Sequence, residues 1–228
     1  MRNATVGQKG FSLVELSVVL VVIGLLVAAV TVGRDLQRNA VYQQVSTEFV
    51  QGWSVAYESH VDRTGVVPGD SQTNPTREVN EGSGALCGVA LRNAMLAAGV
   101  RLPGGRAEGA EDRFAYLDAN GNPQEVRLCF TSQDWSVPGA SSGNYLVRKR
   151  NVMTLEGLTP DLARYLDNQF DGRADARFGN FREQLWAADT SSTNRAWSRD
   201  SRDSIAGGQP GSNEFQLVVL SGRLKMSR

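Results

Sequence analysis

Glu15 is an isolated acidic side chain at the start of a long apolar segment. Residues 16–33 contain no charged side chain, and an acid at the edge of such a run is costly in lipid unless it meets a cation or serves a function. Cleavage between Gly10 and Phe11 would supply that cation, because the new α-amine is largely protonated at neutral pH and lies four residues from Glu15. The residues therefore predict an ion pair between Glu15 and a freed amino terminus. The alternative is a carboxylate hydrated at the membrane surface.

Residues 10–16, with the sequence GFSLVEL, resemble the leader junction of type IV prepilins and of type II secretion pseudopilins. The shared features are a glycine, an aromatic residue directly after it, an acid at the fifth position after the cut, and the apolar run that follows. The resemblance implies a leader peptide at residues 1–10, cleavage after Gly10 by a prepilin peptidase/methyltransferase, and N-methylation of Phe11. It also implies an assembly role for Glu15, which would pair with the Phe11 amine of a neighbouring subunit.

The same resemblance implies partners and a location. The partners are the prepilin peptidase/methyltransferase, other pilin or pseudopilin subunits, an inner-membrane assembly platform, and membrane lipid before assembly; no cofactor is implied. The chain would cross the inner membrane once, hold its globular domain in the periplasm, and then enter a pilus or pseudopilus filament.

A secretory signal peptide is the competing interpretation of the amino terminus. Residues 27–29 offer a small-residue cleavage site, but this interpretation gives no role to Glu15, and we rank it lower. No proline occurs between residues 11 and 67, whereas many major pilins carry one midway along this helix. Its absence favours a minor subunit.

One long helix is predicted for residues 11–64, spanning a membrane over about 11–33. The 23 residues of that span extend about 35 Å as a helix, enough to cross the hydrocarbon core. The second half carries an apolar side chain every fourth residue, which predicts one face packed on a core. This stripe consists of Val41, Val45, Phe49, Trp53, Tyr57 and Val61. Gly65 and Pro68 then end the helix, and His60, beside the stripe, is predicted to be a surface or edge residue.

Cys87 and Cys129 are the two cysteines of the chain, and their spacing fits neither a redox nor a haem-binding motif. Two buried thiols are one interpretation. Export across a membrane favours the other, a structural disulfide. It would close a loop of about 43 residues and stabilise the fold by about 4 kcal/mol.

Residues 65–228 are predicted to form a globular α+β domain with an antiparallel sheet. An Asn-Gly turn between two apolar segments predicts a β-hairpin, and Thr159-Pro160 is a helix start. The expected elements are helices at 85–99 and 159–170 and strands at 114–117, 125–130, 145–147 and 215–220. The expected buried face of the first helix consists of Leu86, Val89, Ala90, Met95 and Leu96.

Asp167, Asp171 and Asp175 form an acidic cluster of the kind that can bind calcium. Hard cations prefer more uncompensated oxygens, and Arg173 and Arg177 stand among these acids. We therefore prefer a solvated helix end and loop, and we assign no metal.

A polar, serine-rich segment at about 187–213 predicts a mobile loop. Trp197 within it is either a contact residue for a partner or an aromatic side chain packed back on the domain. Basic runs at 148–150 and 223–228 are interpreted as solvated strand faces. Lys plus Arg and Asp plus Glu both number 24, and this balance does not favour nucleic-acid binding.

The sequence favours a structural role over an enzymatic one. It contains no GxSxG, HExxH or P-loop motif, and one histidine leaves little scope for acid–base chemistry. The leading hypothesis is a minor subunit of a type IV pilus-like filament. The alternative is a pseudopilin of a type II secretion system, and a tip adhesin, a DNA-binding pilin and a membrane-tethered enzyme rank below both.

Overall fold

The computed structural model describes residues 12–105, 109–118, 121–198 and 220–227. It divides the chain into two compact units, Met1–Ala40 and Val41–Arg228. The predicted leader and Phe11, where the predicted membrane span begins, lie outside the described residues.

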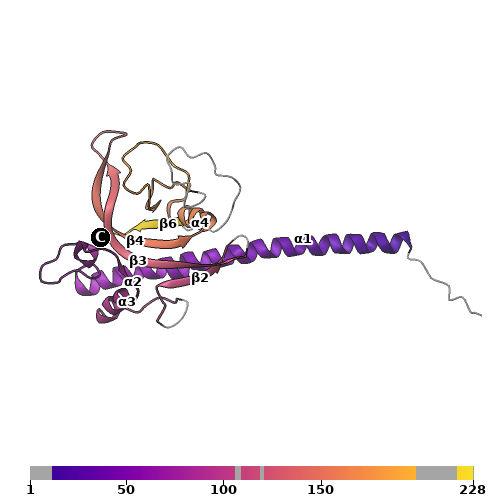
Figure 1. Ribbon diagram of the computed structural model, residues 1–228, viewed down its shortest axis with the longest axis horizontal. Coiled ribbons are helices and arrows are strands. Elements are labelled where there is room, and N and C mark those ends of the chain that lie inside the picture. Colours follow the sequence, from indigo (N-terminus) through magenta and orange to yellow (C-terminus); the bar gives the residue numbers. More distant parts are fainter. Residues whose placement is uncertain (1–11, 106–108, 119–120, 199–219, 228) are drawn as a thin grey trace, which may run out of the picture. The chain divides into compact units, whose positions relative to one another are not determined.

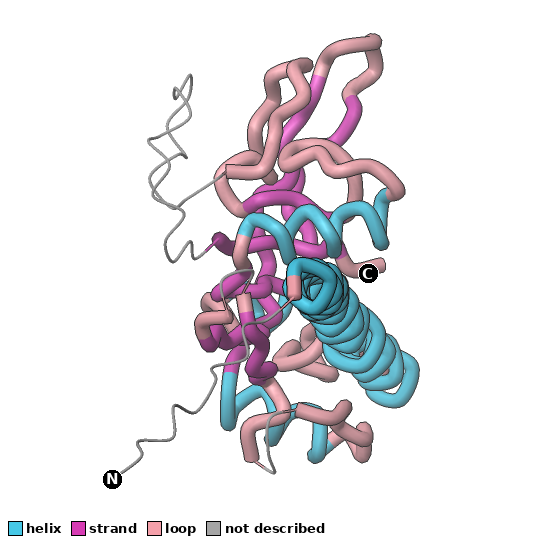
Figure 2. The backbone as a smooth tube through the Cα atoms, turned by 90° about the vertical axis from the view of Figure 1, so that its right-hand side faces the viewer, coloured by secondary structure: helices cyan, strands magenta, loops and turns pink. Residues whose placement is uncertain are grey.

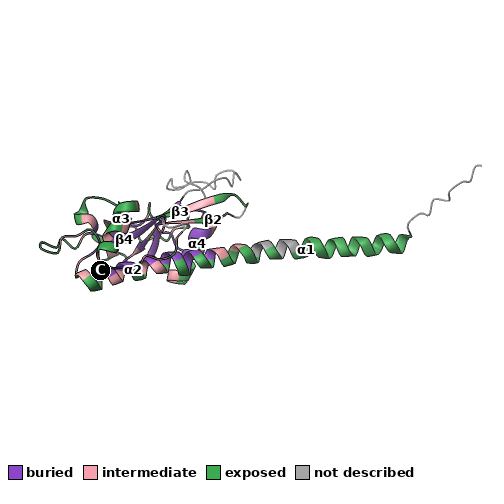
Figure 3. Ribbon diagram, turned by 90° about the horizontal axis from the view of Figure 1, so that it is seen from below, coloured by how far each residue is buried: buried purple, intermediate pink, exposed green. Residues whose placement is uncertain are grey.

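The described part of the first unit is helical. Helix α1 (Leu13–Gln44) begins there, and the large apolar side chains between Leu13 and Val27 are 48% to 85% exposed. Figure 3 shows this exposure as a continuous green stretch. No helix among the described residues meets the length and hydropathy expected of a membrane-spanning segment.

The second unit continues the helical path with a π-helical segment, η1 (Val45–Val50), and helix α2 (Gln51–Thr64). Gly65 ends α2 in a left-handed conformation, φ 78°, and donates its N–H to the Val61 carbonyl. A stripe repeating every four residues drifts around a helix of 3.6 residues per turn. The wider π turn offsets this drift. Every stripe residue from Val45 to Val61 is accordingly buried.

An antiparallel sheet and two further helices complete the second unit, which confirms the predicted α+β class. The strand order is β1-β3-β4-β6-β5, and β2 pairs with β3. Figure 2 shows the strands in magenta and the helices in cyan. The elements are η2 (Val79–Gly82), β1 (Leu86–Cys87), α3 (Gly88–Ala97), β2 (Arg113–Leu117), β3 (Pro123–Pro138), β4 (Tyr145–Leu158), α4 (Pro160–Asp171), β5 (Phe181–Glu183) and β6 (Leu220–Lys225).

The core lies between α2 and the sheet, and Figure 1 shows α2 running along the strands. Trp53 meets Phe130 of β3 at a centroid distance of 6.2 Å, and Tyr57 meets the same ring at 5.0 Å. All three side chains are fully buried. The stripe read from the sequence thus positions the helix on the sheet.

The predicted hairpin and the predicted second helix are confirmed. Strands β2 and β3 pair from Arg113↔Arg127 to Leu117↔Pro123, although Asn120 of the turn lies outside the described residues. Thr159 caps α4 by accepting a hydrogen bond from the Leu162 N–H. Strand β6 begins, in the described residues, at Leu220, so residues 215–219 of the predicted last strand are not covered.

Two predictions of burial are wrong. His60 is buried rather than superficial, because α2 presents it beside the stripe and its Nδ1 lies 3.2 Å from the Val66 carbonyl oxygen. Within the segment predicted as helix 85–99, residues 86–87 form a strand, which shifts the helical face. Leu91 is therefore buried, while Val89 and Leu96 are 61% and 57% exposed.

Candidate functional site

Glu15 is part of a capping box at the start of α1. The Ser12 N–H donates to Glu15 Oε2 at 2.8 Å, and the Glu15 N–H donates to Ser12 Oγ at 3.2 Å. This reciprocal pair satisfies two donors that a helix start leaves unpaired. The Ser-x-x-Glu spacing of this capping box is a sequence signal that could have predicted the helix start.

The capping box leaves the carboxylate of Glu15 exposed. The hydrogen-bond partner of the carboxylate is the N–H of Ser12, three residues away, so the carboxylate can exchange it for a cation without unfolding anything else. Gly10 and Phe11, the predicted cleavage and methylation residues, lie outside the described residues.

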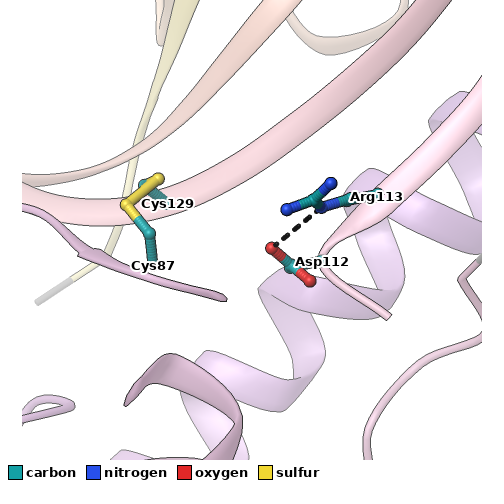
Figure 4. The surroundings of a disulfide bond; sticks show 4 residues. All are labelled: Cys87, Asp112, Arg113 and Cys129. Carbon is teal, nitrogen blue, oxygen red and sulfur yellow. Dashed lines mark ion pairs between the residues drawn. A yellow bond between two sulfur atoms is a disulfide. The ribbon is translucent and has the colours of Figure 1, made fainter. Parts of the chain in front are cut away.

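Cys87 and Cys129 are joined by a disulfide bond (Figure 4). They face each other in the register of β1 and β3, with a Cα–Cα distance of 4.5 Å. Nearby, Arg113 Nε lies 3.9 Å from Asp112 Oδ2. The bridge ties the start of α3 to the long central strand β3.

Asp167 is fully buried, contrary to the solvated helix end that the sequence predicted. Its Oδ2 accepts hydrogen bonds from Trp197 Nε1 and from the Asp175 N–H, both at 2.6 Å. Burial raises the pKa of Asp167 to about 7, and these two hydrogen bonds oppose the rise only in part. The negative charges of Asp171 and Asp175 raise it further.

Asp171 and Asp175 organise the backbone that follows α4. Asp171 accepts hydrogen bonds from the N–H groups of Asn180 and Phe181, and Asp175 accepts from those of Arg177 and Phe178. Over the ranges that the structure describes, no group of three His, Cys, Asp or Glu side chains is placed to hold a metal ion. Each of the three aspartates thus accepts at least one hydrogen bond from a main-chain N–H group of the segment that follows α4.

Trp197 resolves the two interpretations of the polar segment in favour of packing on the domain. Its ring stacks on Phe181 at 5.2 Å, and its side chain is 3% exposed. Arg182 fixes the same region by donating to the Ser136 and Ala187 carbonyls at 3.0 and 3.2 Å. Residues 187–198 are thus attached to the sheet; the rest of the predicted mobile loop, from residue 199, lies outside the described residues.

Comparison with known proteins finds a family model that matches the amino terminus. The family model described as the prokaryotic N-terminal methylation motif matches residues 6–31. At its amino terminus the chain is therefore similar to type IV prepilins. No curated protein and no solved structure matches it.

The match covers the residues that carry the predicted chemistry. It spans the Gly10–Phe11 junction, the capping box at Ser12 and Glu15, and most of the apolar run. A prepilin motif implies processing by a prepilin peptidase and assembly with other pilin subunits, and it suggests a membrane-anchored pilus subunit. The motif thus supports a type IV pilin- or pseudopilin-like protein, and it points to a structural protein.

Proposed function

We propose that the chain is a minor structural subunit of a type IV pilus-like filament. Prepilin peptidase removes residues 1–10 and methylates Phe11, and the mature chain enters the filament through its amino-terminal helix. The methylation motif at residues 6–31 carries this proposal.

The exposed apolar helix supports the proposal. Its large side chains, from Leu13 to Val27, have no core of their own in the first unit. Exposure of so many apolar groups to water is unfavourable by about 25 cal/mol per Å². Lipid covers them before assembly, in a single inner-membrane span over about 11–33, and neighbouring helices cover them in the filament.

Two further features agree with this role. The globular domain of residues 65–228 lies in the periplasm before assembly, an oxidising compartment in which the Cys87–Cys129 bridge is stable. The lack of proline between residues 11 and 67 favours a minor subunit over a dominant one.

Glu15 changes partner during assembly. In the free subunit its carboxylate caps its own helix through Ser12. In the filament it pairs with the Phe11 amine of a neighbour, where the absence of water makes an unpaired acid costly. The pair sets the axial register of the subunit.

Three variants separate the charge of Glu15 from its capping role. Glu15→Ala removes both, Glu15→Gln keeps an oxygen for the Ser12 N–H but removes the charge, and Ser12→Ala removes the hydroxyl acceptor but keeps the charge. We expect leader cleavage and membrane anchoring in all three. We expect loss of filament incorporation in both Glu15 variants and near-parental incorporation of Ser12→Ala.

The measurement is the distribution of each variant between membranes and sheared filaments, with cleavage followed by intact mass. The mature mass should correspond to a chain beginning at methylated Phe11; a chain beginning near residue 30 would instead indicate a secretory signal peptide. Parental incorporation of Glu15→Gln would show that capping, not charge, is what assembly requires.

A further inference from the structure

Strand β4 is longer than the strand beside it, and this leaves part of its edge open. Strands β3 and β4 pair from Arg127↔Glu156 to Pro138↔Tyr145. Strand β6 pairs with β4 only from residue 152 onwards. Figure 1 shows the β3–β4 pair continuing past the short β6. Among the residues that the structure describes, no strand pairs with this edge of β4 at residues 145–150.

The carboxyl-terminal residues show why β6 stops there. The Met226 N–H donates to the Asn151 carbonyl at 2.9 Å, which is the last rung on this side. The hydroxyl of Ser227 then bonds to the carboxylate of Glu58 on α2. The chain therefore leaves β4 for the helix, and the edge beyond Asn151 stays uncovered by β6.

Main-chain groups of two residues face this open edge. In an antiparallel strand the N–H and C=O of one residue point to the same side, and the side alternates along the chain. Because the Asn151 carbonyl points toward β6, the main-chain groups of Lys149 and Val147 point the same way. The Arg150 guanidinium donates to the Lys149 carbonyl at 3.2 Å, so a side chain stands where a strand partner would bond.

The side chains along the edge define its chemistry. Arg148, Lys149 and Arg150 are all exposed, and no ion pair within 4 Å joins any of them to another described residue. Leu146 and Val147 are each 43% exposed. The edge thus offers three exposed cations next to two apolar side chains; Asp134 of β3 is the cross-strand neighbour of Lys149, but no ion pair within 4 Å joins them.

The segment is also held rigid from the other side. Trp135, directly opposite Arg148 in the ladder, is 1% exposed and lies under the Arg182 guanidinium at 4.2 Å. At the start of the strand, the Arg177 guanidinium lies 4.7 Å from the centre of the Tyr145 ring. A rigid edge loses little conformational entropy when it binds a partner.

We propose that residues 145–150 of β4 are a docking site for an extended acidic peptide segment of a partner protein, which adds to the sheet as a strand. Main-chain bonds to Val147 and Lys149 fix the peptide in register. Because side chains alternate between the two faces of a strand, carboxylates on one face of the peptide pair with Arg148 and Arg150, and apolar side chains on its other face meet Val147. This interaction is independent of the Glu15 chemistry and goes beyond filament assembly.

Two other occupants fit the edge less well. A second copy pairing β4 to β4 would place like charges against each other, which destabilises cross-strand neighbours. Single-stranded nucleic acid stacks its bases on free aromatic rings, but Tyr145 is already packed on Arg177 and Phe178. Lysine and arginine on an edge strand also prevent aggregation. If that were their only role here, an acidic peptide would not bind.

The test is fluorescence anisotropy with the full chain in detergent micelles and a labelled peptide of alternating glutamate and valine. A lysine–valine peptide of the same length and an oligo-thymidine strand serve as the comparison probes. We expect the acidic peptide to bind, more weakly as salt rises, and the other two probes not to compete with it.

Variants distinguish strand addition from simple charge attraction. Lys149→Ala/Arg150→Ala should weaken binding about tenfold or more by removing charge. Val147→Pro removes an edge N–H, which an edge strand tolerates, and should weaken binding about as much while every cation remains. Arg164→Ala, an exposed cation on α4, is the matched control and should bind as the parent does.

Circular dichroism and thermal unfolding confirm that each variant is folded. If Val147→Pro is misfolded, amide I infrared spectra of the parent with isotope-labelled peptide measure strand addition directly.

Absence of binding by the parent would overturn the proposal, as would unchanged affinity in the double variant. Preference for oligo-thymidine would assign the edge to nucleic acid instead. Binding that survives Val147→Pro, or adds no strand signal, would reduce the site to electrostatic attraction.

Discussion

The two units of the chain use the same apolar residue types in opposite ways. Between Leu13 and Val27 the large apolar side chains are 48% to 85% exposed, whereas Trp53, Phe130 and Leu155 of the second unit are fully buried. The second unit therefore carries the determinants of its stability within itself. The described residues of the first expose apolar surface, which we propose is covered by lipid or by neighbouring subunits.

Glu15 of the first unit and Asp167 of the second also differ in exposure and in the range of their hydrogen bonds. Glu15 is exposed and held by two local hydrogen bonds, so it can change partners. Asp167 is fully buried and accepts hydrogen bonds from residues 8 and 30 positions away in the sequence. A mutation in the first unit should alter what the chain assembles with, and a mutation in the second should alter whether the domain is folded.

The largest expected effect comes from a core substitution in the second unit. Trp53 packs on Phe130, and its Nε1 donates to the Glu111 carbonyl at 2.9 Å. Trp53→Ala should cost about 3–5 kcal/mol, which lowers the unfolding temperature by roughly 6–20 °C for a chain of this size. Leu20→Ala, 68% exposed in the first unit, should leave that temperature nearly unchanged.

Thermal unfolding of both variants in detergent, followed by near-ultraviolet circular dichroism, measures the contrast. A shift in Leu20→Ala as large as that in Trp53→Ala would mean that the folding of the two units is coupled, and the comparison would no longer hold.

A smaller loss is expected from removing the disulfide. Replacing both Cys87 and Cys129 by serine removes a cross-link between residues 42 apart, and such links typically contribute about 2–4 kcal/mol, mainly by restricting the unfolded chain. Urea unfolding of the parent with reductant should match that of the double variant. Thiol labelling of the denatured, exported protein should find no free cysteine in the parent; two free thiols would contradict the bridge.

A third expected effect depends on pH. Asp167 keeps its proton more tightly in the folded domain than in the unfolded chain, because its pKa rises from 3.8 to about 7. Its contribution to stability is therefore present at low pH and is lost as the pH rises through about 7. Asp167→Asn mimics the protonated acid, so it should be close to the parent at low pH and more stable than the parent at pH 8.

Unfolding temperatures measured from pH 4 to pH 8 decide this prediction. Asp161→Asn, at the exposed start of the same helix, is the control and should keep the parental pH profile. Equal profiles for the parent and Asp167→Asn would show that the buried acid does not titrate in this range. Arg177 and Arg182 are buried in the segment that follows this helix. Their positive charges would then be the first explanation, because nearby cations keep a carboxylate ionised.

Patterns within one element were predicted well from the sequence. The stripe from Val45 to Val61 gave the packed face of the helix, and Thr159-Pro160 gave the start of α4, because spacing and capping act over a few residues. The α3 face was predicted incorrectly, since two residues at its start joined the sheet instead. His60 was misplaced because the sequence did not reveal that Val66 turns back over it.

The sequence alone predicts the chemistry of the amino terminus, and a family model matches it there. The Gly10–Phe11 junction, Glu15 and the apolar run are contiguous, so the arrangement can be inferred without knowing the fold. Only the tertiary structure decided the partners of Asp167 and the open edge of β4. Each depends on segments far apart in the chain, Trp197 in the first case and Ser227 with Glu58 in the second, and no local pattern encodes such contacts.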